Sequence, residues 1–119
     1  MKKIKLKDTT FYKKQHINCG GKLLDLSTPK VMAIVNLTPD SFYDGGTNNT
    51  KKKILLLCEK HLKAGAEILD VGGQSTRPGA EQMGSDKELK RVLPALEVIS
   101  KEFPESFISI DTYHAKVAE

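Results

Sequence analysis

Polar residues that could bind a ligand gather in three short stretches, and each stretch directly follows a run of apolar residues. The first stretch begins at Asn36, the second covers residues 72–77, and the third begins at Asp111. The side-chain oxygen of an asparagine at a strand end suits a hard cation that keeps several of its waters. A carboxylate accepts paired hydrogen bonds from a guanidine-like group. The three stretches are therefore candidates for one shared ligand site.

Each of these residues also has an ordinary structural interpretation. Asn36 could cap the turn that follows it, and Asp111 could be the N-cap of a helix that begins near Tyr113. Thr76 could be a simple turn threonine, and Arg77 could form a surface ion pair. The residue types alone leave both interpretations open.

Three apolar runs alternate with three segments of helical periodicity. Residues 31–35 form an uninterrupted apolar run, as expected for a strand that is buried on both faces. In residues 50–64 the apolar side chains recur at helical spacing and fall on one face of a helix. The expected strands are residues 31–35, 68–71 and 107–110, and the expected helices are residues 50–64, 85–103 and 113–119.

Local signals predict where the helices start and stop. Gly65 can end the first helix, because glycine readily adopts the left-handed conformation found after helix C-termini. Ser85 and Glu88 have the spacing of a capping box, which predicts the start of the second helix. Pro94 is expected to kink or restart that helix, since proline removes a backbone donor. The expected apolar face of the second helix consists of Leu89, Val92, Leu93, Leu96 and Phe103.

The alternation of strand and helix predicts an α/β fold with parallel strands and right-handed crossovers. In a (β/α)₈ barrel the active site lies at the carboxyl ends of the strands, where the three polar stretches fall. A doubly wound sheet also binds ligands there, but no G-x-G-x-x-G fingerprint follows any of these strands. We therefore predict that residues 31–119 are the N-terminal portion of a (β/α)₈ barrel with about three βα units. Residues 1–30 are predicted to be a lead-in, with a candidate hairpin around Gly20 and Gly21.

Composition and charge exclude several classes of partner. The chain has 119 residues, of which 39% are apolar and 29% are charged, a balance typical of a globular domain. Its net charge of +4 comes mostly from lysines near the N-terminus and at positions 51–53. Because these lysines are not interleaved with aromatic residues, we expect no nucleic-acid partner. No apolar run is long enough to predict a membrane span.

The cysteines and histidines indicate neither a disulfide framework nor a zinc site. Cys19 and Cys58 lie far apart and are interpreted as reduced thiols of a cytoplasmic protein. His16, His61 and His114 have no partner at metal-ligand spacing, so we expect them to be structural or exposed.

Three motifs resemble those of one known family. Residues 36–46, with the sequence NLTPDSFYDGG, resemble the first signature of the dihydropteroate synthases, which are pterin-binding TIM-barrel enzymes. Residues 70–80, DVGGQSTRPGA, resemble the second signature, and residues 109–112, SIDT, resemble the end of the third strand. The motifs occur in the order and at the spacing of the family, and they cover nearly everything from residue 31 onward.

The resemblance implies a transferase of folate biosynthesis. Dihydropteroate synthases condense 6-hydroxymethyl-7,8-dihydropterin diphosphate with p-aminobenzoate, which forms 7,8-dihydropteroate and releases diphosphate. Departure of the diphosphate needs positive charge or hydrogen-bond donors on its oxygens, normally with Mg²⁺ bridging them. The implied cofactor is therefore Mg²⁺, the implied partners are the two small substrates, and the full-length relatives are expected to be homodimers.

The resemblance also implies a role for individual residues. Asn36 is assigned to Mg²⁺ and the diphosphate, Thr76 to the pterin diphosphate, and Asp111 to the guanidine-like edge of the pterin ring. Asp40 and Arg77 are assigned to catalysis, and Asp40 would stabilise positive charge on the pterin methylene. The residues expected in loops that close over p-aminobenzoate and exclude water are Phe42, Ser75 and Pro78.

The sequence departs from the family in two ways, of which the short length has the larger effect on the predicted function. Gln74 stands where the family usually has glutamate, and 119 residues are far fewer than the roughly 250 of a complete barrel. We therefore expect this chain alone to be inactive. Two alternatives remain open, a pterin-dependent methyltransferase and a non-catalytic remnant that binds a partner through exposed strand edges.

Overall fold

The structure is a computed structural model that describes residues 15–37, 47–73 and 84–119. The chain divides into two compact units, with the division between Lys30 and Val31. Each unit is described by itself. Among the described residues, no helix is both long enough and apolar enough to cross a membrane.

The first unit contains an antiparallel hairpin of β1 (His16–Cys19) and β2 (Lys22–Asp25). The two residues between the strands, Gly20 and Gly21, both have positive φ angles of 59° and 92°. Two-residue hairpin turns with positive φ at both positions match the twist of the flanking strands, and glycine adopts them without strain. The Asn18 side-chain oxygen accepts a hydrogen bond of 2.8 Å from the Gly21 amide and stabilises the turn.

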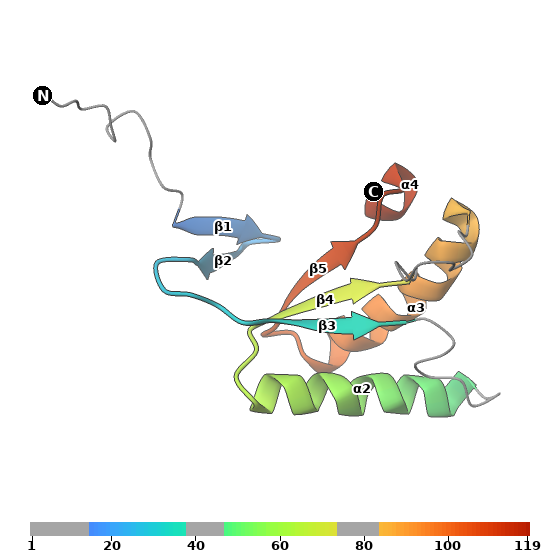
Figure 1. Ribbon diagram of the computed structural model, residues 1–119, viewed down its shortest axis with the longest axis horizontal. Coiled ribbons are helices and arrows are strands. Elements are labelled where there is room, and N and C mark those ends of the chain that lie inside the picture. The colour runs from blue at the N-terminus through green and yellow to red at the C-terminus, as the bar shows by residue number, and fades with distance from the viewer. Residues whose placement is uncertain (1–14, 38–46, 74–83) are drawn as a thin grey trace, which may run out of the picture. The chain divides into compact units, whose positions relative to one another are not determined.

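The second unit contains a three-stranded parallel sheet in the order β3, β4, β5 (Figure 1). The strands are β3 (Met32–Asn36), β4 (Ile68–Gly72) and β5 (Phe107–Asp111). They confirm the three expected strands, and each continues one residue farther than predicted. Because of this extension, the first polar residue after each apolar run still belongs to the sheet.

The crossovers between the strands are the helices α2 (Thr47–Lys63) and α3 (Ser85–Glu102). Gly65, with a φ of 111°, follows the end of α2 as predicted. A short helix α4 (Ala115–Ala118) follows β5, with His114 as its N-cap. It covers part of the helix that was expected over residues 113–119.

The start of α3 differs from the prediction. Gly84 is the N-cap and makes no side-chain capping bond, so the expected capping box of Ser85 and Glu88 is wrong. The Glu88 side chain contacts His114 instead. Pro94 lies inside α3, which runs past it as a single helix, because the proline lies on the exposed side.

The core lies between the sheet and the two long helices. Side chains alternate across a strand, so Val35, Leu69 and Val71 face the helices and are fully buried. Met32 and Ile34 face the other way and are exposed. The buried cluster consists of Val35, Leu37, Ile54, Cys58, Leu69, Val71, Val92, Ala95 and Ile99.

Helix α3 confirms the predicted apolar face in part, because Val92 is buried and Leu96 and Phe103 pack against the core. Its buried residues are Glu88, Val92, Ala95 and Ile99, whereas Leu93 is exposed. These positions follow the i, i+4, i+7, i+11 spacing of a single helical stripe. A glutamate therefore occupies a position of the stripe that faces the core.

Candidate active site

Asn36, Gly72 and Asp111 are aligned at the carboxyl ends of the three strands. The register pairs Asn36 with Gly72 and Gly72 with Asp111. Paired residues of parallel strands point to the same face, and here it is the face away from α2 and α3. Asn36 is half-buried and Asp111 is exposed. Two of the predicted site residues therefore lie on one face, separated by a single glycine.

The absence of a side chain at Gly72 creates the space that Asp111 uses. A Cβ placed on Gly72 would lie 3.3 Å from the Asp111 Cβ, 3.4 Å from its carbonyl oxygen and 3.6 Å from its Oδ2. Contacts of 3.3 Å are tighter than ordinary van der Waals separations, so a larger residue would push Asp111 away. The glycine thus lets the Asp111 carboxylate lean over the end of β4.

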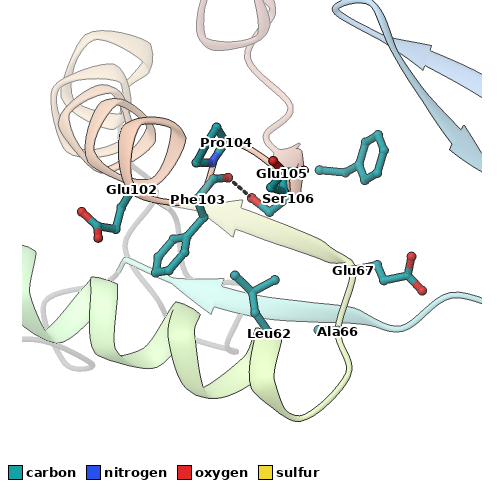
Figure 2. Close-up of a pocket in the computed structure, with 9 residues that line it drawn as sticks. Leu62, Ala66, Glu67, Glu102, Phe103, Pro104, Glu105 and Ser106 are labelled. Atoms are coloured by element: carbon teal, nitrogen blue, oxygen red, sulfur yellow. Dashed lines mark hydrogen bonds between the residues drawn. The ribbon is translucent and has the colours of Figure 1, made fainter.

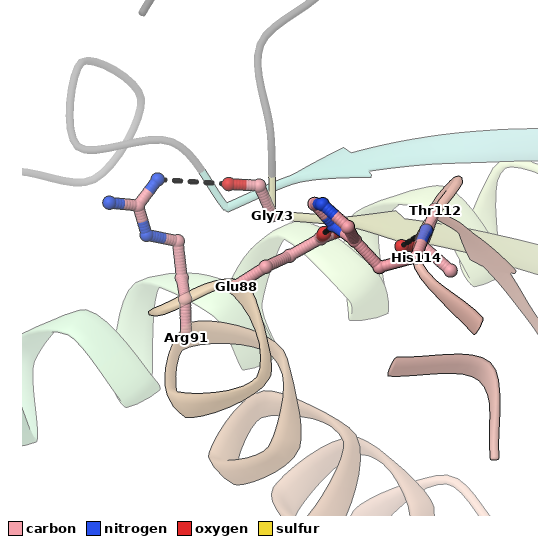
Figure 3. Close-up of polar contacts among 5 residues, drawn as sticks. All are labelled: Gly73, Glu88, Arg91, Thr112 and His114. Carbon is pink, nitrogen blue, oxygen red and sulfur yellow. Dashed lines mark hydrogen bonds and ion pairs between the residues drawn. The ribbon is translucent and has the colours of Figure 1, made fainter. Parts of the chain in front are cut away.

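Gly73, the next residue, contacts α3. A Cβ on Gly73 would lie 2.8 Å from the Val92 Cγ2, a distance at which one of the two atoms would have to move. The Arg91 Nη1 donates a hydrogen bond of 2.9 Å to the Gly73 carbonyl oxygen (Figure 3). The end of β4, where the second polar stretch begins, is therefore fixed on α3 by packing and by a charged donor.

A second contact joins α3 to the segment after β5. The His114 Nδ1 lies 2.6 Å from the Glu88 Oε1 (Figure 3). The tautomer of His114 sets the direction of this hydrogen bond, and the carboxylate form of Glu88 accepts from a protonated Nδ1. The Glu88 side chain is 1% exposed and that of His114 is 21% exposed. The His114 amide also donates to the Thr112 Oγ1 over 3.1 Å, which closes the turn between β5 and α4.

Sequence reasoning missed this contact because it gave both residues other roles. Glu88 was expected in a capping box, and His114 was expected to be structural or exposed without a named contact. A helical wheel drawn through Val92, Ala95 and Ile99 would have shown Glu88 on the inner side of α3.

An exposed ion pair accompanies the buried one. The Lys116 Nζ donates to the Asp86 Oδ1, and it connects α4 to the first turn of α3. This hydrogen bond is the main reason that the pKa of Asp86 is lowered from its usual value. Exposed pairs of this kind contribute little to stability.

The described residues contain no group of three His, Cys, Asp or Glu side chains that could hold a metal ion. The donor type at the carboxyl edge is instead the amide oxygen of Asn36. Mg²⁺ keeps several waters and is often held by one or two protein oxygens together with substrate phosphates. A single amide oxygen fits such an ion when a diphosphate supplies further oxygens.

All of the other predicted site residues lie in parts of the chain that the structure does not describe, and Gln74 lies there too. The predictions for residues 38–46 and 74–83 therefore stay predictions. The predicted site residues concerned are Asp40, Phe42, Ser75, Thr76, Arg77 and Pro78.

A pocket of about 350 Å³ lies at the opposite end of the strands (Figure 2). Leu62 of α2 and Phe103 after α3 contribute apolar walls, and Glu67 and Phe107 lie at the beginnings of β4 and β5. In proteins built from βα units, the amino ends of the strands serve stability rather than catalysis. This pocket is therefore separate from the site formed by Asn36 and Asp111.

The fold and the position of these side chains define a class of protein. Consecutive βα units place parallel strands side by side in chain order, and polar side chains stand at their carboxyl ends. This is the arrangement of a (β/α) barrel enzyme, and the described residues contain three of its parallel strands. The chain belongs to the pterin binding enzymes, because the sequence model of the family described as "Pterin binding enzyme" matches residues 32–119.

Two bacterial dihydropteroate synthases are similar to this chain in sequence. The dihydropteroate synthase of Escherichia coli K12 is 50% identical over 97 residues, which are 82% of this chain and 34% of that protein. The Bacillus subtilis dihydropteroate synthase is 51% identical over 89 residues, which are 75% of this chain and 31% of that protein.

A solved structure of a dihydropteroate synthase is similar to this chain in fold. The Xanthomonas albilineans dihydropteroate synthase with 4-aminobenzoic acid superposes with a TM-score of 0.78 at 40% identity. The superposition covers 88% of this chain and 38% of the other. The chain thus spans about a third of the length of the bacterial enzymes that it matches, and the fold corresponds to the N-terminal part of their TIM barrels.

Proposed function

We propose that this chain forms the pterin diphosphate side of a dihydropteroate synthase active site. The reaction joins 6-hydroxymethyl-7,8-dihydropterin diphosphate to p-aminobenzoate, which yields 7,8-dihydropteroate and releases diphosphate. One observation carries the proposal: Asn36 and Asp111 share one face at the carboxyl ends of the strands, with Gly72 between them. The family membership of the chain supports the assignment of that face to a pterin substrate.

Asp111 is suited to the pterin ring. The ring presents adjacent N–H donors along a guanidine-like edge, and a carboxylate can accept two of them at once. Asp111 is exposed and lies within van der Waals distance of a position where Gly72 has no Cβ. A flat ring can therefore approach the carboxylate without meeting a side chain from β4.

Asn36 is suited to the diphosphate end of the substrate. Its amide oxygen would hold Mg²⁺ together with oxygens of the diphosphate. The bound ion supplies positive charge that stabilises the leaving diphosphate. Asn36 and Asp111 lie on the outer two of the three strands, and the substrate would extend between them across β4.

The loop residues retain the roles that the motifs assign to them. Thr76 would contact the pterin diphosphate, and Asp40 would stabilise the positive charge that develops on the methylene carbon as diphosphate departs. Arg77 would be catalytic together with Asp40. Phe42, Ser75 and Pro78 would lie against p-aminobenzoate and exclude water. The amine of p-aminobenzoate attacks the methylene carbon and loses a proton, and the broken bond is that to the diphosphate oxygen.

About two-thirds of the length of the relatives lies outside the match to this chain, and we infer that residues there complete the active site of those enzymes. We infer a cytoplasmic location and a homodimer for the complete enzyme, as expected for this family. The prediction that the 119 residues alone are inactive follows from the same argument, because substrate groups on the far side of the barrel would have no partners.

The test measures diphosphate release with Mg²⁺, the pterin diphosphate and p-aminobenzoate. The 119-residue chain is assayed alone, and also as a chimera in which residues 32–119 replace the matching segment of the E. coli relative. We expect no turnover from the chain alone and sustained turnover from the chimera. Asn36→Ala and Asp111→Asn in the chimera should each lower kcat/KM by about a hundredfold or more, because each removes a group that binds the substrate.

Asp86→Asn is the matched control, because it makes the same chemical change on an exposed aspartate of α3 that pairs with Lys116. The control should retain the activity of the chimera. The proposal is wrong if the chimera is folded but inactive, or if it binds a methylated folate and not p-aminobenzoate. Full activity of Asp111→Asn would contradict the role of that carboxylate.

A further inference from the structure

The carboxylate of Glu88 is fully buried on the core-facing side of α3. The residue occupies a core-facing position in line with Val92 and Ala95, where an apolar side chain would pack at no electrostatic cost. One oxygen accepts from His114, and the other is buried without a hydrogen-bond partner among the described residues. Removing a carboxylate from water is expensive unless specific contacts compensate it.

The contacts of Glu88 and Arg91 lead to the ends of two neighbouring strands. Arg91, three residues after Glu88, donates to the Gly73 carbonyl oxygen over 2.9 Å at the end of β4. Glu88 accepts from the His114 Nδ1 over 2.6 Å, beyond the end of β5. Residues three apart lie on the same face of a helix. One turn of α3 therefore reaches both strand ends at once (Figure 3).

The segment from Asp111 to His114 is short and constrained. The His114 amide donates to the Thr112 Oγ1, and the His114 imidazole is held by Glu88. Asp111 is one residue before Thr112 and pairs with Gly72, which is one residue before Gly73. The hydrogen bonds of Arg91 and Glu88 are therefore made close in sequence to Gly72 and Asp111, the two residues that form the pterin side of the proposed site.

We propose that Glu88 and Arg91 are positioning residues for the pterin substrate. Glu88 acts through His114 on β5, and Arg91 acts through the Gly73 carbonyl on β4. Together they set the separation of the two strand ends at which the Asp111 carboxylate lies over Gly72. This inference rests on the proposed function, since it assigns a purpose to the placement of Asp111.

Two substitutions of His114 separate positioning from general stability. In His114→Asn the side-chain N–H occupies nearly the place of the imidazole Nδ1–H, so the bond to Glu88 is preserved. In His114→Ser the hydroxyl is too short to reach Glu88. Asparagine and serine are both good N-caps, so α4 should be equally stable in the two variants. The only intended difference is the contact with Glu88.

The variants are made in the chimera with the E. coli relative, which is the parent protein of this test, and KM is measured separately for each substrate. We expect His114→Ser to raise KM for the pterin diphosphate about tenfold, as misplacement of a binding group does, with KM for p-aminobenzoate unchanged. His114→Asn should stay within about twofold of the parent protein. Glu88→Gln keeps the accepting oxygen and should resemble His114→Asn, whereas Glu88→Ala should resemble His114→Ser.

The proposal is overturned if His114→Ser and His114→Asn have the same KM for the pterin diphosphate. It is also overturned if His114→Ser raises KM for both substrates equally, which would indicate general loosening of the fold. If the parent protein binds no pterin diphosphate, the proposed function fails and this inference fails with it. A parent protein that turns over, with variants that do not differ, would reject the inference alone.

Discussion

Gly72 and Asp111 are register partners on β4 and β5, and a Cβ on the glycine would lie 3.3 Å from the Cβ of the aspartate. The position of the carboxylate therefore depends on an atom that is missing from the neighbouring strand. A site assembled in this way is sensitive to the smallest possible substitution, and the sensitivity can be measured.

Gly72→Ala should displace Asp111 and weaken pterin binding while the protein stays folded. The added methyl group needs a shift of a few tenths of an ångström, which we expect to cost about 1 kcal/mol of unfolding free energy. We expect KM for the pterin diphosphate to rise about tenfold in the chimera with the E. coli relative. Gly84→Ala is the control, because a Cβ there meets nothing within 4 Å. Equal KM values for the two variants would contradict this account of Gly72.

Gly73→Ala should affect stability more than Gly72→Ala does. The new Cβ would lie 2.8 Å from the buried Val92 Cγ2, so we expect a loss of about 1–3 kcal/mol in the free energy of unfolding. Urea denaturation measures the loss. In a Val92→Ala background the methyl group that clashes is absent, and Gly73→Ala should cost less there. An equal cost in both backgrounds would mean that Val92 is not the source of the strain.

Cys58 should make the stability depend on pH in alkaline solution. Burial raises the pKa of its thiol from 9.0 to about 11. Below pH 9.0 the thiol is neutral in the folded and unfolded states and contributes no pH dependence. As the pH rises from 9.0 toward 11 the unfolded chain ionises first, so stability should fall by on the order of 2 kcal/mol.

Denaturation below pH 9.0 and near pH 11 checks this expectation, with Cys58→Ala as the control. Other groups titrate in the same range, and they do so in both proteins. The decrease should therefore be smaller in the variant. If parent and variant lose the same stability, the thiol is not responsible.

Pro94→Ala should stabilise the protein. Proline lacks the N–H that would bond to the preceding turn, and alanine restores that donor at an exposed position. We expect a gain of about 1–3 kcal/mol, seen as a higher denaturation midpoint. Leu93→Ala, at the neighbouring exposed position, should change the stability by less than about 0.5 kcal/mol. If Pro94→Ala and Leu93→Ala change the stability equally, the backbone hydrogen bond that Pro94 cannot donate has no net effect on stability.

The sheet and the ends of its strands were predictable because their signals are local. Each strand is a short and mainly apolar segment, interrupted by Asp70 in β4 and by Ser109 in β5, and Asn36 and Asp111 are the polar residues that end β3 and β5. The alternation of strand and helix then required the strands to be parallel, which brings their carboxyl ends to one edge. Chain order and polarity alone were enough to place both residues there.

The contacts made by α3 were not predictable in the same way, because they depend on how the helix is rotated. Ser85 and Glu88 have the spacing of a capping box whether or not the glutamate is buried. Leu93 was expected in the core and is exposed, whereas Ala95 is buried. The rotation that buries Ala95 is favoured by close packing of Val92 on Gly73, a contact between residues far apart in the sequence.

Asn36 and Asp111 lie on strands that pair with β4 but not with each other. The two side chains therefore come together only after both strands have docked on β4. During synthesis β3 emerges long before β5, so this shared face is among the last features of the segment to form. A ligand that contacts both side chains would bind the completed sheet and not the unfolded chain, and its binding free energy would add to the cooperativity of folding.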